Sequence, residues 1–174
     1  MNEVYVEESR LPKLVYFFIS LFLFSLWIYF LWGSYEQLIL EGSFGTKPMS
    51  DNGLIIFMVS YTILSFLLAW LFVSMKLSVK VENGNLSYRF PPFINKLRVI
   101  DSTKITSWAI KKPKFFVIGL GLRFDPVRNA TIYSTGSKYF LTIKLKKGKN
   151  LWFSTKNPLK LEKIINKIES KTYE

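Results

Sequence analysis

Residues 14–35, LVYFFISLFLFSLWIYFLWGSY, form 22 consecutive positions without a charged side chain. A second uncharged stretch of 24 residues, 52–75, contains LIIFMVSYTILSFLLAWLFV. About 20 apolar residues are enough for a helix to cross the hydrocarbon core of a bilayer, and a helix satisfies its own backbone hydrogen bonds there. We therefore predict a hairpin of two transmembrane helices, at about 14–34 and 53–75, because a soluble helix would keep a polar face that neither stretch has.

Charge is divided unevenly between the two parts of the chain. Residues 1–74 carry three basic and six acidic residues, a net charge of −3, whereas residues 75–174 carry 21 basic and six acidic residues, a net charge of +15. This change in composition predicts a domain boundary near Met75. Residues 1–75 would then comprise an N-terminal flank and the two helices, and residues 76–174 a separate cytoplasmic domain.

The charges that flank the two stretches predict their orientation. The loop at 36–51 has one lysine and three acidic residues, whereas the second stretch runs into Lys76 and Lys80. By the positive-inside rule, both termini would lie in the cytoplasm and the protein would be a two-span component of a bacterial inner membrane. Ser65 and Ala69, four residues apart, could form a small-residue helix contact or be ordinary residues of a membrane span.

The basic part of the chain reads as strands. Apolar residues alternate with polar ones at 77–82 and again at 86–90, and Asn83-Gly84 lies between the two runs. Asn-Gly between alternating runs is typical of a β-hairpin. Further strands are expected at 97–100, 106–111, 115–118, 120–124, 131–134, 141–146 and 151–155.

The period of the apolar residues changes near the C-terminus. Asn157 suits a helix N-cap and Pro158 a first helical position. Leu161, Ile164, Ile165 and Ile168 then follow at the i, i+3, i+4, i+7 spacing of one helix face. About seven strands closed by one helix predict an α+β domain, a barrel or sandwich like that of pleckstrin-homology (PH) domains.

Three segments within 77–168 resemble the bacterial PH-like domains of small two-span membrane proteins. Residues 119–123 (GLGLR) look like the Gly-aromatic-Gly-Ile-Arg segment of that family, although Leu120 stands where an aromatic residue is usual. Residues 130–136 (ATIYSTG) and 147–159, with a Thr-x-x-Pro turn, are the other two. The resemblance implies a PH-like fold that follows two membrane helices. It implies no catalytic activity, since the family has no general catalytic role.

Lysines supply the clearest candidate binding surface. The candidate lipid or partner surface consists of Lys111, Lys112, Lys114, Lys144, Lys146, Lys147 and Lys149. Each lysine near an anionic membrane surface is worth about 1 kcal/mol, so lipid headgroups are the first expected partner, but a merely solvated face would also look like this. We do not expect a nucleic-acid partner, because no RNA- or DNA-binding motif accompanies the charge.

Several classes of chemistry are excluded by composition. The chain has no Cys and no His, so Cys or His nucleophiles, Ser-His-Asp triads and the usual zinc, haem and iron–sulfur sites are absent. Asp101 and Asp125 are not spaced as a catalytic pair. We therefore expect no enzyme, no cofactor and no metal. Gly119, Gly121 and Arg123 form a candidate structural motif, in which the glycines mark a bulge or a close backbone approach.

These observations predict a membrane-anchored, non-catalytic interaction module. Its PH-like domain would be held at the inner leaflet and would bind a protein partner with help from anionic lipid. The alternative is an accessory or assembly subunit of a larger integral membrane complex, with the hairpin packed into that complex. A transporter or channel component is disfavoured, because such proteins place charges within the membrane and the two stretches, 14–35 and 52–75, contain no Asp, Glu, Lys or Arg.

Overall fold

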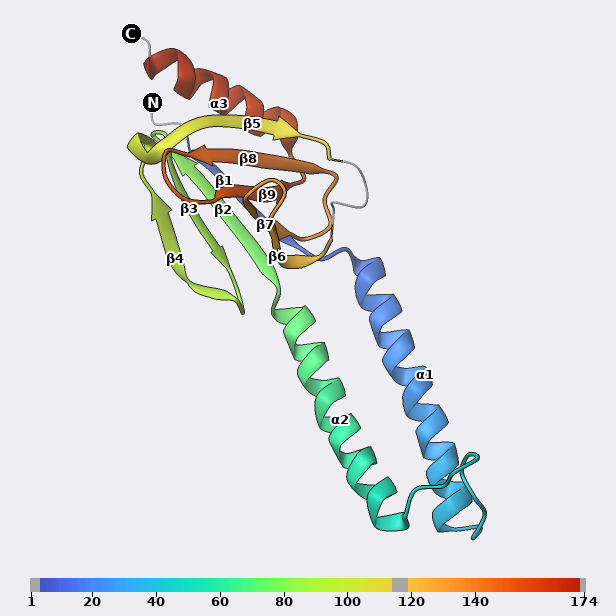
Figure 1. Ribbon diagram of the computed structural model, residues 1–174. Coiled ribbons are helices and arrows are strands. Elements are labelled where there is room, and N and C mark those ends of the chain that lie inside the picture. The colour runs from blue at the N-terminus through green and yellow to red at the C-terminus, as the bar shows by residue number, and fades with distance from the viewer. Residues whose placement is uncertain (1–3, 114–118, 173–174) are drawn as a thin grey trace. The chain divides into compact units, whose positions relative to one another are not determined.

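The computed structural model describes residues 4–113 and 119–172 (Figure 1). The chain divides into two compact units. One is the segment 13–73. The other combines the N-terminal residues up to Pro12 with the chain from Ser74 onward. The sequence analysis had placed residues 1–12 with the helices, whereas the structure makes them part of the C-terminal domain.

The first unit is a pair of long helices, α1 (Lys13–Leu38) and α2 (Asp51–Ser74). Both are long and apolar enough to cross a membrane. The less exposed positions recur at alternating spacings of three and four, the spacing of knobs-into-holes packing. On α1 these positions include 19, 23, 26, 30, 33 and 37. On α2 they include 54, 58, 61, 65, 68 and 72.

Specific contacts join the two helices. The Tyr61 hydroxyl donates a hydrogen bond to the Leu23 carbonyl at 2.9 Å, and the ring centroid of Phe30 lies 5.4 Å from that of Tyr61. Ser65 lies on this half-buried face and donates to the Tyr61 carbonyl. Ala69 is exposed, so the two small residues do not share one packing face within this hairpin.

The loop between the helices folds back onto α1. The Phe44 ring lies where a Cβ on Gly33 would be, since such an atom would come within 2.3 Å of the ring. The Gln37 side-chain amide donates to the Met49 carbonyl at 2.7 Å and to Asp51 Oδ1 at 2.8 Å. These contacts fix the far end of the hairpin.

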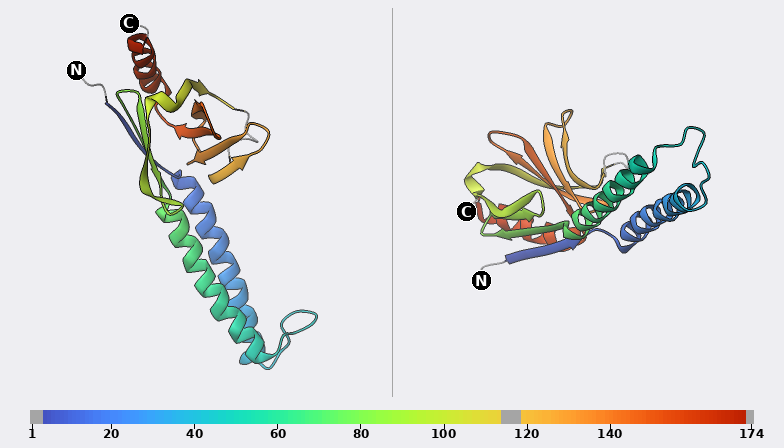
Figure 2. Two further views of the ribbon diagram at one scale, coloured as in Figure 1. Left: turned by 60° about the vertical axis from the view of Figure 1, so that its left-hand side comes forward. Right: turned by 90° about the horizontal axis from the view of Figure 1, so that it is seen from below.

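The second unit contains two sheets, which Figure 2 shows as separate layers. Sheet A has the order β1-β2-β3-β4, from β1 (Val4–Arg10), β2 (Lys76–Glu82), β3 (Asn85–Phe90) and β4 (Ile94–Ile100). Sheet B has the order β5-β8-β9-β7-β6, from β5 (Ile105–Lys111), β6 (Gly121–Asp125), β7 (Ala130–Ser134), β8 (Tyr139–Leu145) and β9 (Asn150–Thr155). A short 3-10 turn, η1 (Ser102–Lys104), precedes β5.

The domain core lies between the sheets and α3 (Pro158–Thr172). Val81 and Phe90 come from sheet A, Ile143 and Phe153 from sheet B, and Leu161 from α3, and all five are almost completely buried. The α+β architecture with a C-terminal helix is therefore confirmed. The prediction allowed a barrel or a sandwich of about seven strands, and a closed barrel is not found. The described strands number nine and form two open sheets of four and five strands, since no pairing joins β4 to β5 or β1 to any strand of sheet B.

The predicted hairpin at 77–90 is confirmed as β2 and β3. Asn83 and Gly84 take positive φ values of 50° and 78°, as a turn matched to strand twist requires. The strand expected at 97–100 is longer, Ile94–Ile100. The strand expected at 115–118 lies outside the described residues.

Strand β1 was not anticipated from the sequence. It pairs antiparallel with β2 along its whole length, from Val4 opposite Glu82 to Arg10 opposite Lys76. Its buried side chains are Tyr5, Glu7 and Ser9, whereas its valines face outward. Apolar alternation would therefore point to the wrong face of this strand. Its inward face is polar in part, and hydrogen bonds of Glu7 and Ser9 with residues in or beside sheet B satisfy it.

Candidate anion-binding site

Side chains alternate along β8 and β9, so sheet B has an outer face opposite the core. Leu141 and Ile143 of β8 and Phe153 of β9 join the core between the sheets. Their neighbours must point to the opposite side, because successive side chains of a strand alternate between faces. Thr142 and Trp152, which are cross-strand partners, therefore lie on the outer face of sheet B.

A small apolar cluster forms the floor of this outer face. It consists of Ala130, Ile132, Phe140 and Trp152. The Phe140 and Trp152 ring centroids lie 6.2 Å apart, and Trp152 is only 8% exposed. The outer face is therefore firmly packed at its centre, with polar side chains around that centre.

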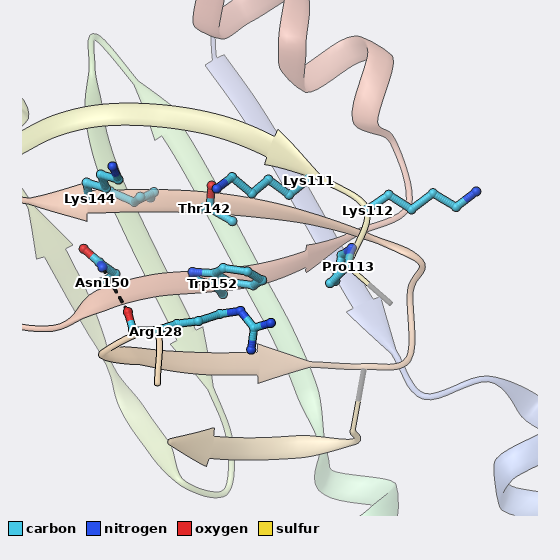
Figure 3. Close-up of a pocket in the computed structure, with 9 residues that line it drawn as sticks. Lys111, Lys112, Pro113, Arg128, Thr142, Lys144, Asn150 and Trp152 are labelled. Atoms are coloured by element: carbon cyan, nitrogen blue, oxygen red, sulfur yellow. Dashed lines mark hydrogen bonds between the residues drawn. The ribbon is translucent and has the colours of Figure 1, made fainter. Parts of the chain in front are cut away.

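The outer face contains a hollow of about 750 Å³ (Figure 3). This volume lies in the range of small-molecule sites. Among the residues that the structure describes, four cationic side chains and no carboxylate line the hollow. Its lining residues are Lys111, Lys112, Pro113, Arg128, Thr142, Ile143, Lys144, Asn150 and Trp152. We call it the basic hollow.

Arg128 is held in place by the turn between β6 and β7. Its guanidinium pairs with Asp125 at 2.5 Å, and the centre of the guanidinium lies 5.7 Å from the Trp152 ring. The hydrogen bonds from Arg128 hold the pKa of the Asp125 carboxyl below its usual value. Asn150 supports the turn from β9 by donating through Nδ2 to the Arg128 carbonyl at 3.3 Å.

The three lysines of the basic hollow differ from Arg128. Among the residues that the structure describes, no ion pair involves Lys111, Lys112 or Lys144. The Lys112 ammonium lies 5.8 Å from the centre of the Tyr139 ring, a weak attraction at an exposed site. Positive charges gathered around one hollow repel one another and make the local electrostatic potential positive. An anion bound there would reduce this repulsion.

The structure separates the lysines that the sequence analysis had grouped. Lys111, Lys112 and Lys144 line the basic hollow. Lys146, Lys147 and Lys149 belong to the connection between β8 and β9 and are not among its lining residues; the Lys149 ammonium lies 3.9 Å from the centre of the Phe124 ring. Lys114 lies outside the described residues.

Sequence reasoning missed Arg128, Asn150 and Thr142 and did not assign Trp152 to a site. One signal was available, since Thr142 and Lys144 alternate with the core residues of β8, and Trp152 alternates with those of β9. Arg128 had no such signal. It lies in a turn, and only the pairing of β7 with β9 brings that turn beside Trp152.

The glycine motif has a structural explanation. Gly121 begins β6 with φ at 83°, a conformation that strongly favours glycine. A Cβ on Gly119 would lie 3.0 Å from Arg123 Nη1, so the Arg123 side chain packs close to the backbone there. Asp125, at the end of the same strand, pairs with Arg128.

A second polar cluster surrounds Glu7 of β1. Thr155 Oγ1 donates to Glu7 Oε2 at 2.6 Å, the Lys156 amide donates to Oε1 at 2.7 Å, and the Tyr5 hydroxyl also donates to Oε2. Burial, together with Glu7, raises the pKa of Tyr5. Because protein donors surround the buried carboxylate, we assign this cluster a structural role, the attachment of β1 to sheet B.

Metal-ligating groups and comparisons add no further assignment. Within 4–113 and 119–172, no group of three or more acidic, His or Cys residues is placed to hold a metal ion. Comparison with protein-family models, curated proteins and solved structures found no match. The function must therefore be argued from the basic hollow and from the way the domain is connected to the helices.

Proposed function

We propose that this protein is a membrane-anchored, non-catalytic interaction module. Its two helices would span the membrane, and its two-sheet domain would bind a protein partner with help from anionic lipid. The observation that carries the proposal is the basic hollow, whose described lining has four cations and no carboxylate. Three of these cations, Lys111, Lys112 and Lys144, have no ion pair among the described residues. Uncompensated charge of this kind stabilises no fold by itself, whereas it attracts and orients an oppositely charged partner.

The connections between the two units support the anchoring role. Only Leu11 and Pro12 separate β1 from α1, and only Met75 separates α2 from β2. Since β1 and β2 pair in one sheet, the beginning of α1 and the end of α2 lie on the same side of any membrane that both helices cross. Links of one and two residues would keep the domain at the bilayer surface.

The PH-like assignment belongs to the same proposal. Strand-rich sequence followed by a C-terminal helix, α3, supports it. The basic residues beyond α2, beginning with Lys76 and Lys80, support a cytoplasmic domain at a bacterial inner membrane. An excess of positive charge in this domain favours a partner with an acidic surface.

Site-specific photo-crosslinking of the full-length protein in cells would test the proposal. We would place the crosslinker at Lys147, beside the basic hollow in the chain, and at Ser78 on the outer face of sheet A as a control. We expect one discrete protein adduct from position 147 and none from position 78. The full chain is needed, because a fragment beginning at residue 76 would lack β1 and its buried Tyr5 and Glu7.

A third crosslinker position addresses the alternative function. Phe66 of α2 is 74% exposed, so in a larger membrane complex it would face either lipid or another subunit. A protein adduct from position 66 with none from position 147 would overturn the interaction module in favour of an accessory subunit. An adduct from position 147 that disappears in the Lys111→Glu/Lys144→Glu variant would support the module.

A further inference from the structure

We propose that the basic hollow binds the headgroup of an anionic membrane lipid that carries more than one negative charge, either a phosphomonoester or a pair of phosphodiesters. This inference rests on the proposed function, because it requires the domain to lie at a bilayer surface. It deepens that function by naming the ligand of the hollow and by separating the lipid site from the surface that meets the protein partner.

The charge of the basic hollow calls for more than one compensating charge. Lys111, Lys112 and Lys144 have no carboxylate partner among the described residues. Arg128 is already paired with Asp125, and that carboxylate is not part of the lining. Three cations therefore remain uncompensated around one cavity, and a single negative charge would leave two of them opposed to each other.

The kind of cation favours phosphate over carboxylate. A guanidinium matches a planar carboxylate through two parallel hydrogen bonds, whereas a lysine ammonium is a compact point charge with rotatable donors. The one arginine of the hollow already binds a carboxylate, Asp125. The three available groups are lysines, which can approach the oxygens of a tetrahedral phosphate from different directions. An acidic peptide is therefore a poorer match than a phosphate group.

The cations of the basic hollow come from separate segments of sheet B. Figure 3 shows Lys111 and Lys112 at the end of β5, Lys144 on β8 and Arg128 in the turn between β6 and β7, with Trp152 among them. Four segments of sheet B thus surround one apolar floor. The volume of about 750 Å³ accommodates a phosphate-bearing headgroup.

The floor of the hollow argues against a nucleotide. A base would need an open aromatic face on which to stack. Trp152 is 8% exposed and packs against Phe140, and the Arg128 guanidinium already lies over its ring. Pro113 is the other apolar side chain in the lining, and glycerol carbons of a lipid could contact it.

Native mass spectrometry of lipid retained by the full-length protein would test the inference. The protein would be placed in nanodiscs of phosphatidylcholine with phosphatidic acid, cardiolipin or phosphatidylglycerol, at equal total lipid charge, and then released into detergent. We expect phosphatidic acid or cardiolipin to be retained in preference to phosphatidylglycerol. Equal retention of all three would overturn the inference, because a diffuse electrostatic attraction depends only on total charge.

A matched pair of double variants locates the lipid. Lys111→Gln/Lys144→Gln removes two charges from the basic hollow, and Lys146→Gln/Lys147→Gln removes two from the neighbouring β8–β9 connection. At about 1 kcal/mol for each lysine, we expect the first variant to bind the preferred lipid about 30-fold more weakly. The second should change binding by less than about threefold. Equal losses in both variants would contradict a defined site.

Soluble competitors distinguish the source of the phosphate. Inorganic pyrophosphate, ATP and a poly-glutamate peptide would be added separately to the lipid-bound protein. We expect none to displace the lipid at concentrations comparable to that of the lipid. Displacement by ATP or pyrophosphate would replace the lipid with a soluble phosphate ligand, and displacement by the peptide would replace it with an acidic protein segment.

The two proposals can fail independently. The lipid measurements use purified protein with no protein partner present. If lipid selectivity is absent while crosslinking from Lys147 persists, the inference about the basic hollow is wrong and the interaction module stands. If lipid selectivity is present while crosslinking is absent, the lipid site stands without a protein partner.

Discussion

Two polar regions of the same domain differ in whether the protein itself compensates their charge. At the inner side of β1, the buried Glu7 carboxylate accepts hydrogen bonds from Tyr5, Thr155 and the Lys156 amide. On the outer face of sheet B, Lys111 and Lys144 are exposed beside a hollow, and the part of its lining that the structure describes has no carboxylate. The first charge is compensated by the protein itself, and the others are not.

The difference separates a structural role from a binding role. A buried charge persists only when neighbouring groups satisfy it, and removing those bonds destabilises the fold. Exposed like charges contribute little to stability and somewhat oppose it. We therefore expect substitutions at Glu7 to change stability without changing lipid selectivity. Substitutions at Lys111 and Lys144 should do the reverse.

Replacing Glu7 should have the largest effect. Glu7→Gln replaces one carboxylate oxygen with an NH2 group. A buried group that donates to that oxygen then loses its hydrogen-bond acceptor. We expect a loss of about 2–4 kcal/mol in the free energy of unfolding. Hydrogen exchange of the full-length protein should show faster exchange in β1 and β9.

Glu8→Gln is the matched control for Glu7→Gln. Glu8 is the next residue of the same strand but faces outward, where it pairs with Lys76 at 2.7 Å. We expect this variant to exchange at nearly the wild-type rate. If both variants exchange alike, the contrast between an internally compensated charge and an exposed one is lost.

Trp152→Phe tests whether the floor of the basic hollow is part of the fold. The change removes ring area from a buried cluster and the cation–π contact with Arg128. We expect a cost of about 1–2 kcal/mol in thermal unfolding of the full-length protein. Trp32→Phe serves as the control, since Trp32 is 65% exposed on α1; an equal cost there would remove the distinction.

Lys144→Gln should change stability much less than either substitution above. Lys144 is exposed and belongs to none of the ion pairs among the described residues, so we expect a change within about 0.5 kcal/mol. Thermal unfolding measures it. A loss as large as that of Glu7→Gln would show that the basic hollow supports the fold and would weaken its assignment as a binding site.

The smallest expected effect is the loss of stability when acid protonates Asp125 of the Asp125–Arg128 pair. Arg128 lowers the pKa of Asp125, so the native state favours the ionised carboxylate. The stabilisation is therefore present above the ordinary Asp pKa of 3.8 and is lost as pH falls through the lower native value. Asp125→Asn should flatten this acid limb slightly in pH-dependent unfolding, and an unchanged limb would contradict the pairing.

Short-range signals predicted several elements correctly. Asn83-Gly84 predicted the β2–β3 hairpin, because a turn with positive φ favours those residue types. Leu161 and Ile165 predicted an apolar face of α3, and both are buried. Each of these signals depends on residues close in sequence, so no knowledge of distant partners was needed.

Long-range pairing decided what the sequence analysis missed. In β1 the apolar Val4 and Val6 face outward. Tyr5 and Glu7 are buried instead, against residues near position 155, and the local sequence pattern does not show this. The lysines were recognised as candidates, but their division into a hollow and a turn depends on the register of β5 against β8. Arg128 joined them only through the pairing of β7 with β9.

The sequence by itself determined two apolar helices, a basic strand-rich domain and a C-terminal amphipathic helix. Length, alternation and turn residues act locally, and solvent transfer favours burial of any apolar stretch whatever its partner. The tertiary structure alone decided that β1 completes sheet A and that Lys111, Lys144 and Arg128 surround Trp152. Those outcomes depend on which distant backbone groups pair, and the residues of one strand do not specify which strand pairs with it.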